Sequence, residues 1–297
     1  MMTSTEKISP TAQSLLQEAQ NFLASRGIEH ARMEAEILLA HVLDVRREDF
    51  LLKDERTVTA TEERRVRELL DRRGRREPLA YLVATREFWS LDFKVNAQVL
   101  IPRPETEGII EELKRRAGAF PPQPLMLDMG TGSGILAVVA AKEIPGGQVT
   151  AVELSPGALE VARENAQRHG VADRIRFMPM DMMKPWKFSG KELFDGILCN
   201  PPYIPEGELD RLMPEVRDYE PRAALLGGPD GLEAYRSIAL NAARYLKPGG
   251  ILIMEMGYGQ SDSVRRILEE AGGFESITII QDLSGHPRVV SARRALG

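Results

Sequence analysis

Residues 125–134 have the sequence LMLDMGTGSG. The first five residues are mostly apolar and predict a short buried strand, and the glycines that follow predict a tight loop. The apolar run that comes next predicts a helix over residues 135–143. A strand, a glycine loop and a helix in this order are typical of an α/β fold, in which such a loop lies at the carboxyl end of its strand.

Strands and helices alternate from this point to the end of the chain. We predict strands at residues 125–129, 148–153, 174–179, 193–199, 250–256, 276–281 and 288–292. We predict helices at residues 135–143, 156–169, 233–245 and 261–271. This alternation predicts an α/β class with a doubly wound, seven-stranded, mostly parallel sheet. A short loop at residues 283–286 makes the last two strands antiparallel neighbours.

The residues before this sheet divide into a helical part and a linker. Helical periodicity predicts one helix from Ser9-Pro10 to Gly27, one that contains residues 31–42, a short one at residues 48–52, and one from Thr61 to Gly74. Alternating residues on both sides of Ser90 predict a β-hairpin, and IPRPETE at residues 101–107 predicts a bend before a helix at residues 105–116. We therefore expect a helical domain at residues 1–80, a β-hairpin linker at residues 81–104, and the α/β domain at residues 105–297.

The composition is that of a globular protein built without disulfides. Net charge is −5, so no global field draws the chain to nucleic acid or to an anionic membrane. One cysteine fits a reducing compartment, and the four histidines show no metal-ligand spacing. Residues 1–10 hold no apolar stretch suited to a signal peptide, and no later run reaches membrane-spanning length. We expect a cytoplasmic protein without a bound metal, and a monomer.

Arginines crowd the last helix of the helical domain and the residues just after it. They are Arg64, Arg65, Arg67, Arg72, Arg73, Arg75 and Arg76. Acidic residues are interleaved with them, which favours a solvated face laced with ion pairs. A docking surface for an acidic or RNA-bound partner is the alternative.

Acidic residues stand where the first three predicted strands end. Asp128 heads the glycine loop, Glu153 ends the second strand, and Asp181-Met182 follow the third. Asp128 would repel a pyrophosphate but can accept hydrogen bonds from an ammonium group, and the lack of Gly-Lys-Ser/Thr disfavours a nucleoside triphosphatase. A strand-end acid suits ribose hydroxyls, and a carboxylate beside a thioether can bracket an adenine ring. Each acid alone suits a helix cap or a surface position, but together they describe a site for S-adenosylmethionine.

The sequence Asn200-Pro201-Pro202-Tyr203 follows the buried strand at residues 193–199. Its prolines cannot continue a ladder, so Asn200 is held at the carboxyl edge of the sheet. The Asn200 side-chain oxygen and the Pro201 carbonyl can accept both hydrogens of an –NH2 group, and the Tyr203 ring can cover its planar face. Such a clamp orients a planar amine or amide nitrogen; a turn that merely ends the strand is the alternative. Cys199 is expected to pack in the core and not to act as a nucleophile.

The order of these motifs resembles class I S-adenosylmethionine-dependent methyltransferases that act on a planar nitrogen. The wider pattern resembles the peptide chain release factor N5-glutamine methyltransferase family, over nearly the whole chain. The resemblance also rests on Tyr81-Leu82, Glu87-Phe88, residues 101–107, Glu220-Pro221-Arg222, Gly227-Gly228, Asp230-Gly231 and Pro248-Gly249-Gly250. This chain departs from the family pattern at Ala84 and Ser90, where glycines are usual, at Met182, where an aromatic is common, and at Glu153, where Asp is more frequent. None of these changes removes a reacting group.

The resemblance implies methylation of a side-chain amide nitrogen (N5) during translation termination. The substrate would be the glutamine of the Gly-Gly-Gln motif in class 1 peptide chain release factors, recognised by the helical domain and held by Asn200 to Tyr203. The methionine part of the cofactor would be held by Gly130, Thr131, Gly132, Ser133 and Gly134. Glu153 would bind ribose, Met182 with Asp181 would contact adenine, and Asn200 would touch both cofactor and substrate. Arg103 and Glu105 lie on the rigid bend, where they suit either a ligand or a surface ion pair.

The hypothetical reaction is an in-line displacement of the sulfonium methyl group by the glutamine amide nitrogen. Asn200, Pro201 and Tyr203 would hold that nitrogen in the near-attack geometry. A rival enzyme class methylates the exocyclic amine of adenine or guanine in nucleic acid, because the clamp suits a base equally well. The acidic chain favours a protein substrate over that rival. A non-catalytic binding module is the third alternative, against which the intact glycine loop and Asn200 argue.

Overall fold

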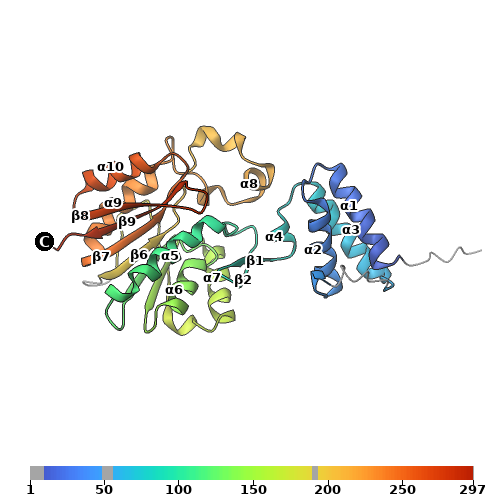
Figure 1. Ribbon diagram of the computed structural model, residues 1–297, viewed down its shortest axis with the longest axis horizontal. Helices are drawn as coiled ribbons and strands as arrows, with labels where there is room; N and C mark the ends of the chain where they lie inside the picture. Colours follow the sequence, from blue (N-terminus) through green and yellow to red (C-terminus); the bar gives the residue numbers. More distant parts are fainter. Residues whose placement is uncertain (1–9, 49–55, 189–192, 297) are drawn as a thin grey trace, which may run out of the picture. The chain divides into compact units, whose positions relative to one another are not determined.

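The computed structural model describes residues 10–48, 56–188 and 193–296, which form two compact units (Figure 1). The first unit holds the described residues as far as Ala84 together with Pro214–Tyr219. The second holds Thr85–Met213 and the described residues from Glu220 onward. Ser9, and nearly all of the short helix predicted at residues 48–52, fall outside the described ranges.

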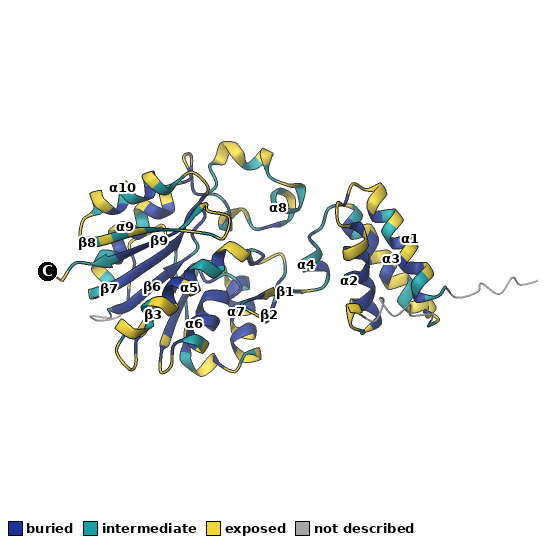
Figure 2. Ribbon diagram, in the orientation of Figure 1, coloured by how far each residue is buried: buried dark blue, intermediate teal, exposed yellow. Residues whose placement is uncertain are grey.

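The first unit is all-helical in its described part. Its helices are α1 (Ala12–Ser25), α2 (Ala31–Leu43), α3 (Ala60–Gly74), α4 (Leu79–Leu82) and α8 (Pro214–Tyr219). Alanines and leucines that recur three and four residues apart on α1 and α2 are buried in the core of this unit, as their period predicts (Figure 2). The capped first helix begins at Ala12 and not at Pro10, because the Thr11 side chain accepts from the Ser14 amide over 3.1 Å.

The start of α3 differs from the predicted start at Thr61. Thr59 has an extended backbone, and its hydroxyl accepts from the Glu62 amide over 3.3 Å. The Glu62 carboxylate in turn accepts from the Thr59 amide over 2.8 Å, which completes a capping box. Thr61 therefore lies inside the helix, because the capping box begins two residues earlier, at Thr59.

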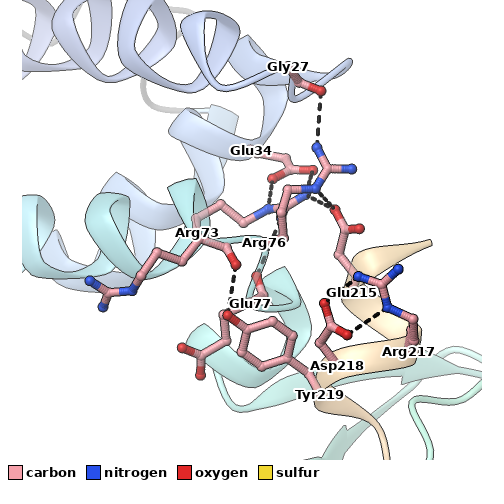
Figure 3. A network of polar contacts seen from close by, with 10 residues as sticks. Gly27, Glu34, Arg73, Arg76, Glu77, Glu215, Arg217, Asp218 and Tyr219 are labelled. Carbon is pink, nitrogen blue, oxygen red and sulfur yellow. Dashed lines mark hydrogen bonds and ion pairs between the residues drawn. The ribbon is translucent and has the colours of Figure 1, made fainter. Parts of the chain in front are cut away.

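The arginines of α3 form ion pairs, and one of them is buried. Arg67 contacts Glu63 and Glu18 on the exposed side, as predicted. Arg73 is only 5% exposed and lies between Glu34 of α2, at 2.5 Å, and Glu215 of α8, at 3.0 Å (Figure 3). This part of the arginine cluster therefore fixes α8 within the first unit and is not a solvated face.

The second unit is built on a seven-stranded sheet with the order β5-β4-β3-β6-β7-β9-β8. Its strands are β3 (Leu125–Met129), β4 (Gln148–Glu153), β5 (Ile175–Pro179), β6 (Phe194–Cys199), β7 (Leu246–Glu255), β8 (Phe274–Gln281) and β9 (Pro287–Arg294). The first five are parallel, whereas β9 pairs antiparallel with both β7 and β8. The predicted α/β class with a mostly parallel seven-stranded sheet is thus confirmed.

Helices cover both faces of this sheet. One face packs against α5 (Glu107–Arg116), α6 (Ile135–Glu143) and α7 (Pro156–Arg168), and the other against α9 (Glu233–Tyr245) and α10 (Ser261–Ala271) (Figure 1). All six residues of β6 are buried, as expected for a central strand covered on both sides. The chain order reverses between β3 and β6, so the switch point of the sheet lies between the ends of these two strands.

The β-hairpin belongs to the second unit. Strands β1 (Thr85–Phe88) and β2 (Leu91–Lys94) pair antiparallel, and Asn165 of α7 exchanges hydrogen bonds with the Lys94 amide and carbonyl over 2.7 and 3.0 Å. Ala84 and Ser90 both have φ of 56°, the left-handed conformation that favours glycine. Both positions thus keep a glycine-like backbone without the glycines that are usual in the family.

None of the helices in the described part of the chain is long and apolar enough to cross a bilayer.

Candidate active site

The carboxyl ends of the parallel strands bring most of the predicted site residues to one edge of the sheet. Asp128 lies opposite Leu198 in the register of β3 and β6, and Glu153 lies opposite Pro179 in that of β4 and β5. Cys199 pairs with Met254, so Asn200 and Glu255 follow side by side. The glycine loop and the Asn200 turn therefore flank the switch point, where open α/β sheets bind ligands.

The glycine loop has the tight backbone that its sequence predicts. Gly130, Gly132 and Gly134 have φ of 79°, 52° and 87°. The amides of Gly130 and Thr131 both donate to the Val152 carbonyl, over 2.8 and 2.9 Å. A Cβ on Gly130 would lie 2.4 Å from Cε of Met182, so the glycine loop and this thioether lie close together.

Asp128 is fully buried behind this loop. Its Oδ2 accepts from Thr131 Oγ1 over 2.6 Å and from the Ala137 amide over 3.0 Å, so it also caps the start of α6. Its Oδ1 has no hydrogen-bond partner within the described part of the chain. Burial raises the pKa of Asp128 from 3.8 to about 7. A buried acceptor of this kind suits a donor from a ligand, such as an ammonium group.

Glu153 and Asp181 accept hydrogen bonds from backbone amides near them. Oε1 of Glu153 accepts from the amides of Leu154 and Ser155 over 2.8 and 3.0 Å, and Oε2 accepts from Gly132 over 3.1 Å. One acceptor position on Oε2 is left, which suits a single hydroxyl. Asp181 accepts from the Met183 amide over 2.9 Å and pairs with Lys184 at 3.3 Å.

The Asn200 turn presents two acceptors. Nδ2 of Asn200 donates to Thr106 Oγ1 over 3.1 Å. Asn200 Oδ1 and the Pro201 carbonyl accept no hydrogen bond from residues 10–48, 56–188 or 193–296. Pro202 is buried, and its neighbour Tyr203 donates from its hydroxyl to Glu255 Oε1 over 3.2 Å.

Two residues that the sequence did not single out support this turn. Thr106 and Glu255 are 0% and 1% exposed, and Thr106 Oγ1 donates to Glu255 Oε2 over 2.6 Å. Burial raises the pKa of Glu255 from 4.5 to about 7, although both hydrogen bonds oppose that rise. A signal for Glu255 was present, because it ends an apolar strand just as Glu153 does. Thr106 lies inside the bend IPRPETE, but nothing in the sequence around it predicts a hydrogen bond to Glu255.

Arg103 and Glu105, the two residues of the bend that the sequence singled out, have different surroundings. Arg103 pairs with Glu220 at 2.5 Å, and Glu220 also accepts from the Ile101 amide over 3.1 Å. Because the Glu220 side chain is 1% exposed, this is a half-buried structural pair and not a surface one. Glu105 is exposed.

Cys199 lies in the core of the second unit. Cys199 is buried, its thiol donates to the Met129 carbonyl over 2.9 Å, and burial raises its pKa well above the usual value. Its predicted place in the core is confirmed. Among the described residues, no three His, Cys, Asp or Glu side chains gather as metal ligands.

Comparisons of the sequence cover both units. Residues 14–83 match the family described as the PrmC N-terminal domain, and residues 106–213 match the methyltransferase small domain. The release factor glutamine methyltransferase of Geobacter sulfurreducens is 44% identical over 95% of this chain and 96% of its own length. The proteins of the same name from Rhodopirellula baltica and Moorella thermoacetica are 40% and 39% identical, each over 96% of this chain and over 97% and 99% of their own lengths.

Comparisons of the fold give more distant similarity. A methyltransferase from Pyrococcus furiosus superposes with a TM-score of 0.51 over 76% of this chain and 98% of that one, at 18% identity. The hMettl16 catalytic domain, solved with an RNA hairpin, gives 0.56 over 80% of this chain and 83% of that one, at 16% identity. At this level of identity the similarity shows a shared methyltransferase fold alone.

Proposed function

This chain belongs to the release factor glutamine methyltransferase family, and we infer that it is an S-adenosylmethionine-dependent enzyme that methylates a glutamine of a peptide chain release factor. The identity of about 40% spans nearly the full length of each relative, so both units of the chain are included in it. The structural observation that supports the inference most directly is the pair of unoccupied acceptors at Asn200 and Pro201.

These two acceptors suit a carboxamide nitrogen, which carries two hydrogens in one plane. Oδ1 of Asn200 and the Pro201 carbonyl would each accept one N–H of the glutamine side chain, beside the Tyr203 ring. An amide nitrogen is a poor nucleophile because its lone pair is delocalised into the carbonyl. Holding it in one orientation lowers the barrier by about 7–11 kcal/mol in favourable cases, and both hydrogen bonds strengthen as positive charge develops on nitrogen.

The residues at the sheet edge also fit the cofactor. The unpartnered Oδ1 of Asp128 suits the ammonium group of S-adenosylmethionine, and the remaining acceptor position of Glu153 suits a ribose hydroxyl. Met182, with Asp181 beside it, would contact adenine, and residues 130–134 would line the methionine part. The bound cofactor supplies the methyl group from a sulfonium centre. The chain's own residues only bind, orient and exclude water.

We propose that the glutamine is that of the Gly-Gly-Gln motif in class 1 release factors, methylated at N5, and that the helical unit recognises the rest of the factor. The match of residues 14–83 to a domain found in this family supports a role specific to its substrates. The cytoplasmic location and the monomeric state stay predictions.

A methyl-transfer assay with purified components tests this function. Radiolabelled methyl from S-adenosylmethionine should appear on a class 1 release factor and disappear when its Gly-Gly-Gln glutamine is replaced by alanine. Ribosomal RNA and DNA, offered in parallel, should stay unlabelled. Label on either nucleic acid and none on the release factor would support the exocyclic-amine alternative instead.

A further inference from the structure

We propose that Thr106 and Glu255 are positioning residues, which fix the side-chain amide of Asn200 so that Oδ1, and not Nδ2, faces the substrate nitrogen. This inference rests on the function proposed above for the same site. It adds two residues that touch neither the cofactor nor the substrate but decide which end of the Asn200 amide is presented.

The Thr106 hydroxyl has a single proton to donate. That proton points to Glu255 Oε2, at 2.6 Å, because an ionised carboxylate has no proton of its own to offer. Thr106 Oγ1 therefore offers only lone pairs to Asn200, 3.1 Å away. Asn200 must therefore donate from its NH2 group, so its Oδ1 points away from Thr106. Because the hydroxyl and carboxylate impose this order, the amide has one favourable orientation and not two.

Protonation of Glu255 reverses the same chain of hydrogen bonds. A proton taken up from solvent at Oε2 would be donated to Thr106, whose own proton would then turn to Asn200. The amide would rotate to place Oδ1 at Thr106, and its NH2 group would face the NH2 group of the substrate. Two donors in contact leave hydrogen-bond groups unpaired, and each unpaired buried group is costly. Glu255 must therefore be ionised for the clamp to hold an amide nitrogen.

The groups around Glu255 set the pH at which it takes up this proton. Thr106 and Tyr203 donate to its two oxygens, and Tyr235 of α9 donates to its backbone carbonyl over 3.3 Å. Glu105 raises its pKa and Arg288 of β9 lowers it, while burial has the largest effect and brings the value to about 7. The buried thiol of Cys199 lies near it as well. The orientation of Asn200 should thus change within an experimentally accessible pH range.

The first test needs no substrate. The side-chain amide of Asn200 in ¹⁵N-labelled full-length protein is assigned from the signal that Asn200→Asp loses, and is followed from pH 5.5 to 8.5. We expect its shift to titrate with a midpoint near 7 in the parent. The midpoint should disappear in Glu255→Gln, which cannot ionise, and in Thr106→Val, which has no hydroxyl. An Asn200 signal that does not titrate in the parent, or that titrates unchanged in Glu255→Gln, would overturn the proposal even if the enzyme's function were different.

The second test uses methyl transfer to a release factor at saturating cofactor. We expect kcat/KM for the factor to fall about tenfold for each pH unit below the Glu255 pKa, since this parameter reports the enzyme before it binds the release factor. Glu255→Gln should lose this acid limb. Thr106→Val should lower kcat about a hundredfold, whereas Thr106→Ser, which keeps the hydroxyl, should stay within about threefold of the parent.

A matched control separates positioning from simple loss of a buried hydroxyl. Thr150 in β4 is 6% exposed and accepts from Arg176 over 3.1 Å, away from Asn200. Thr150→Val should keep the parent's acid limb and the titration of the Asn200 amide. If Glu255→Gln were merely less stable, activity would fall equally at every pH and the limb would remain, which would refute the inference. No label on the release factor with the parent protein would refute the proposed function alone, because the amide titration is still measurable.

Discussion

Arg73 on α3 and Glu215 on α8 form an ion pair of 3.0 Å, although they are 142 residues apart in the chain. Arg73 is held on its other side by Glu34 at 2.5 Å, and its side chain is 6% exposed (Figure 3). Burial alone would lower the pKa of this arginine, but the two carboxylates raise it above its ordinary value. The pair keeps a segment that follows the Asn200 turn in sequence within the helical unit.

Glu215→Ala should therefore destabilise the helical unit. Removing one partner of a buried ion pair leaves the other charge without compensation, which costs about 3–5 kcal/mol. Part of that cost will be relieved because Glu34 stays beside Arg73. We expect a loss of about 2–3 kcal/mol in the free energy of unfolding, with early loss of hydrogen-exchange protection in α8.

Glu18→Ala is the control for this prediction. Glu18 pairs with Arg67 at 3.0 Å in the same unit, but both side chains are about half exposed. Such pairs contribute between 0 and about 1 kcal/mol. Equal effects of the two substitutions would show that the Arg73 network gives no more stability than a surface pair.

The sheet could be predicted closely from the sequence, whereas α8 and the support of Asn200 could not. Apolar runs of strand length and helical periods are local signals, and they placed β3, β4 and α6 at their observed bounds. The sequence of α8, PEVRDY, is short and has no buried apolar face. What holds α8 in place is the ion pair between its Glu215 and Arg73 of the distant helix α3. No local pattern encodes such a partner.

The candidate site shows the same division. Asp128, Glu153 and Asn200 were predicted because each ends a strand at one edge of a parallel sheet. The bond between Thr106 and Glu255 joins residues 149 apart and depends on how α5 and the bend before it lie against β7. The orientation that this bond imposes on the Asn200 amide could not be predicted, because it depends on the positions of all three residues in the folded chain.

Asp128→Asn should stabilise the free protein at alkaline pH. The pKa of Asp128 is raised to about 7 in the folded state, so between pH 4 and 7 the folded chain keeps a proton that the unfolded chain has lost. The stability associated with that proton is full below about pH 4 and is lost as the pH rises toward 7. Asparagine is neutral throughout, so we expect a gain of roughly 2–4 kcal/mol at pH 8 in denaturant titrations.

The gain should shrink toward zero as the pH falls to 4, which identifies the ionised carboxylate as its cause. Cofactor binding gives a separate readout, since Asp128 Oδ1 would lose its charge. Calorimetry should show affinity for S-adenosylmethionine about tenfold weaker or worse. A variant that is stabilised equally at every pH would contradict the assignment.

Ser90→Gly should stabilise the second unit slightly. Trp89 and Ser90 join β1 to β2 with φ of 55° and 56°, the combination of a hairpin turn that prefers glycine at its second position. A side chain in this conformation costs about 1–2 kcal/mol, and the greater freedom of glycine in the unfolded chain offsets part of the gain. We expect a net increase of about 0.5–1 kcal/mol in the free energy of unfolding.

Ser263→Gly in α10 is the matched control, because the same change inside a helix has no left-handed strain to relieve. It should lower stability by about 0.5–1 kcal/mol. If both substitutions lowered stability alike, the turn at Ser90 would not be strained.

Asn200→Ala separates binding of the cofactor from transfer of the methyl group. Its Oδ1 is one of the two acceptors for the substrate amide, so the variant should lose about a hundredfold or more in kcat/KM for a release factor, or about 2.7 kcal/mol of transition-state stabilisation. The glycine loop, Asp128 and Glu153 are untouched, so cofactor affinity by calorimetry should stay within about threefold.

Asn200→Asp refines the result, because it keeps an acceptor but cannot donate to Thr106 and brings a second carboxyl group toward Glu255. Its activity should fall as well, since orientation and not acceptor capacity alone is what the turn provides. Transfer at the parent rate by either variant would mean that the nitrogen is held elsewhere.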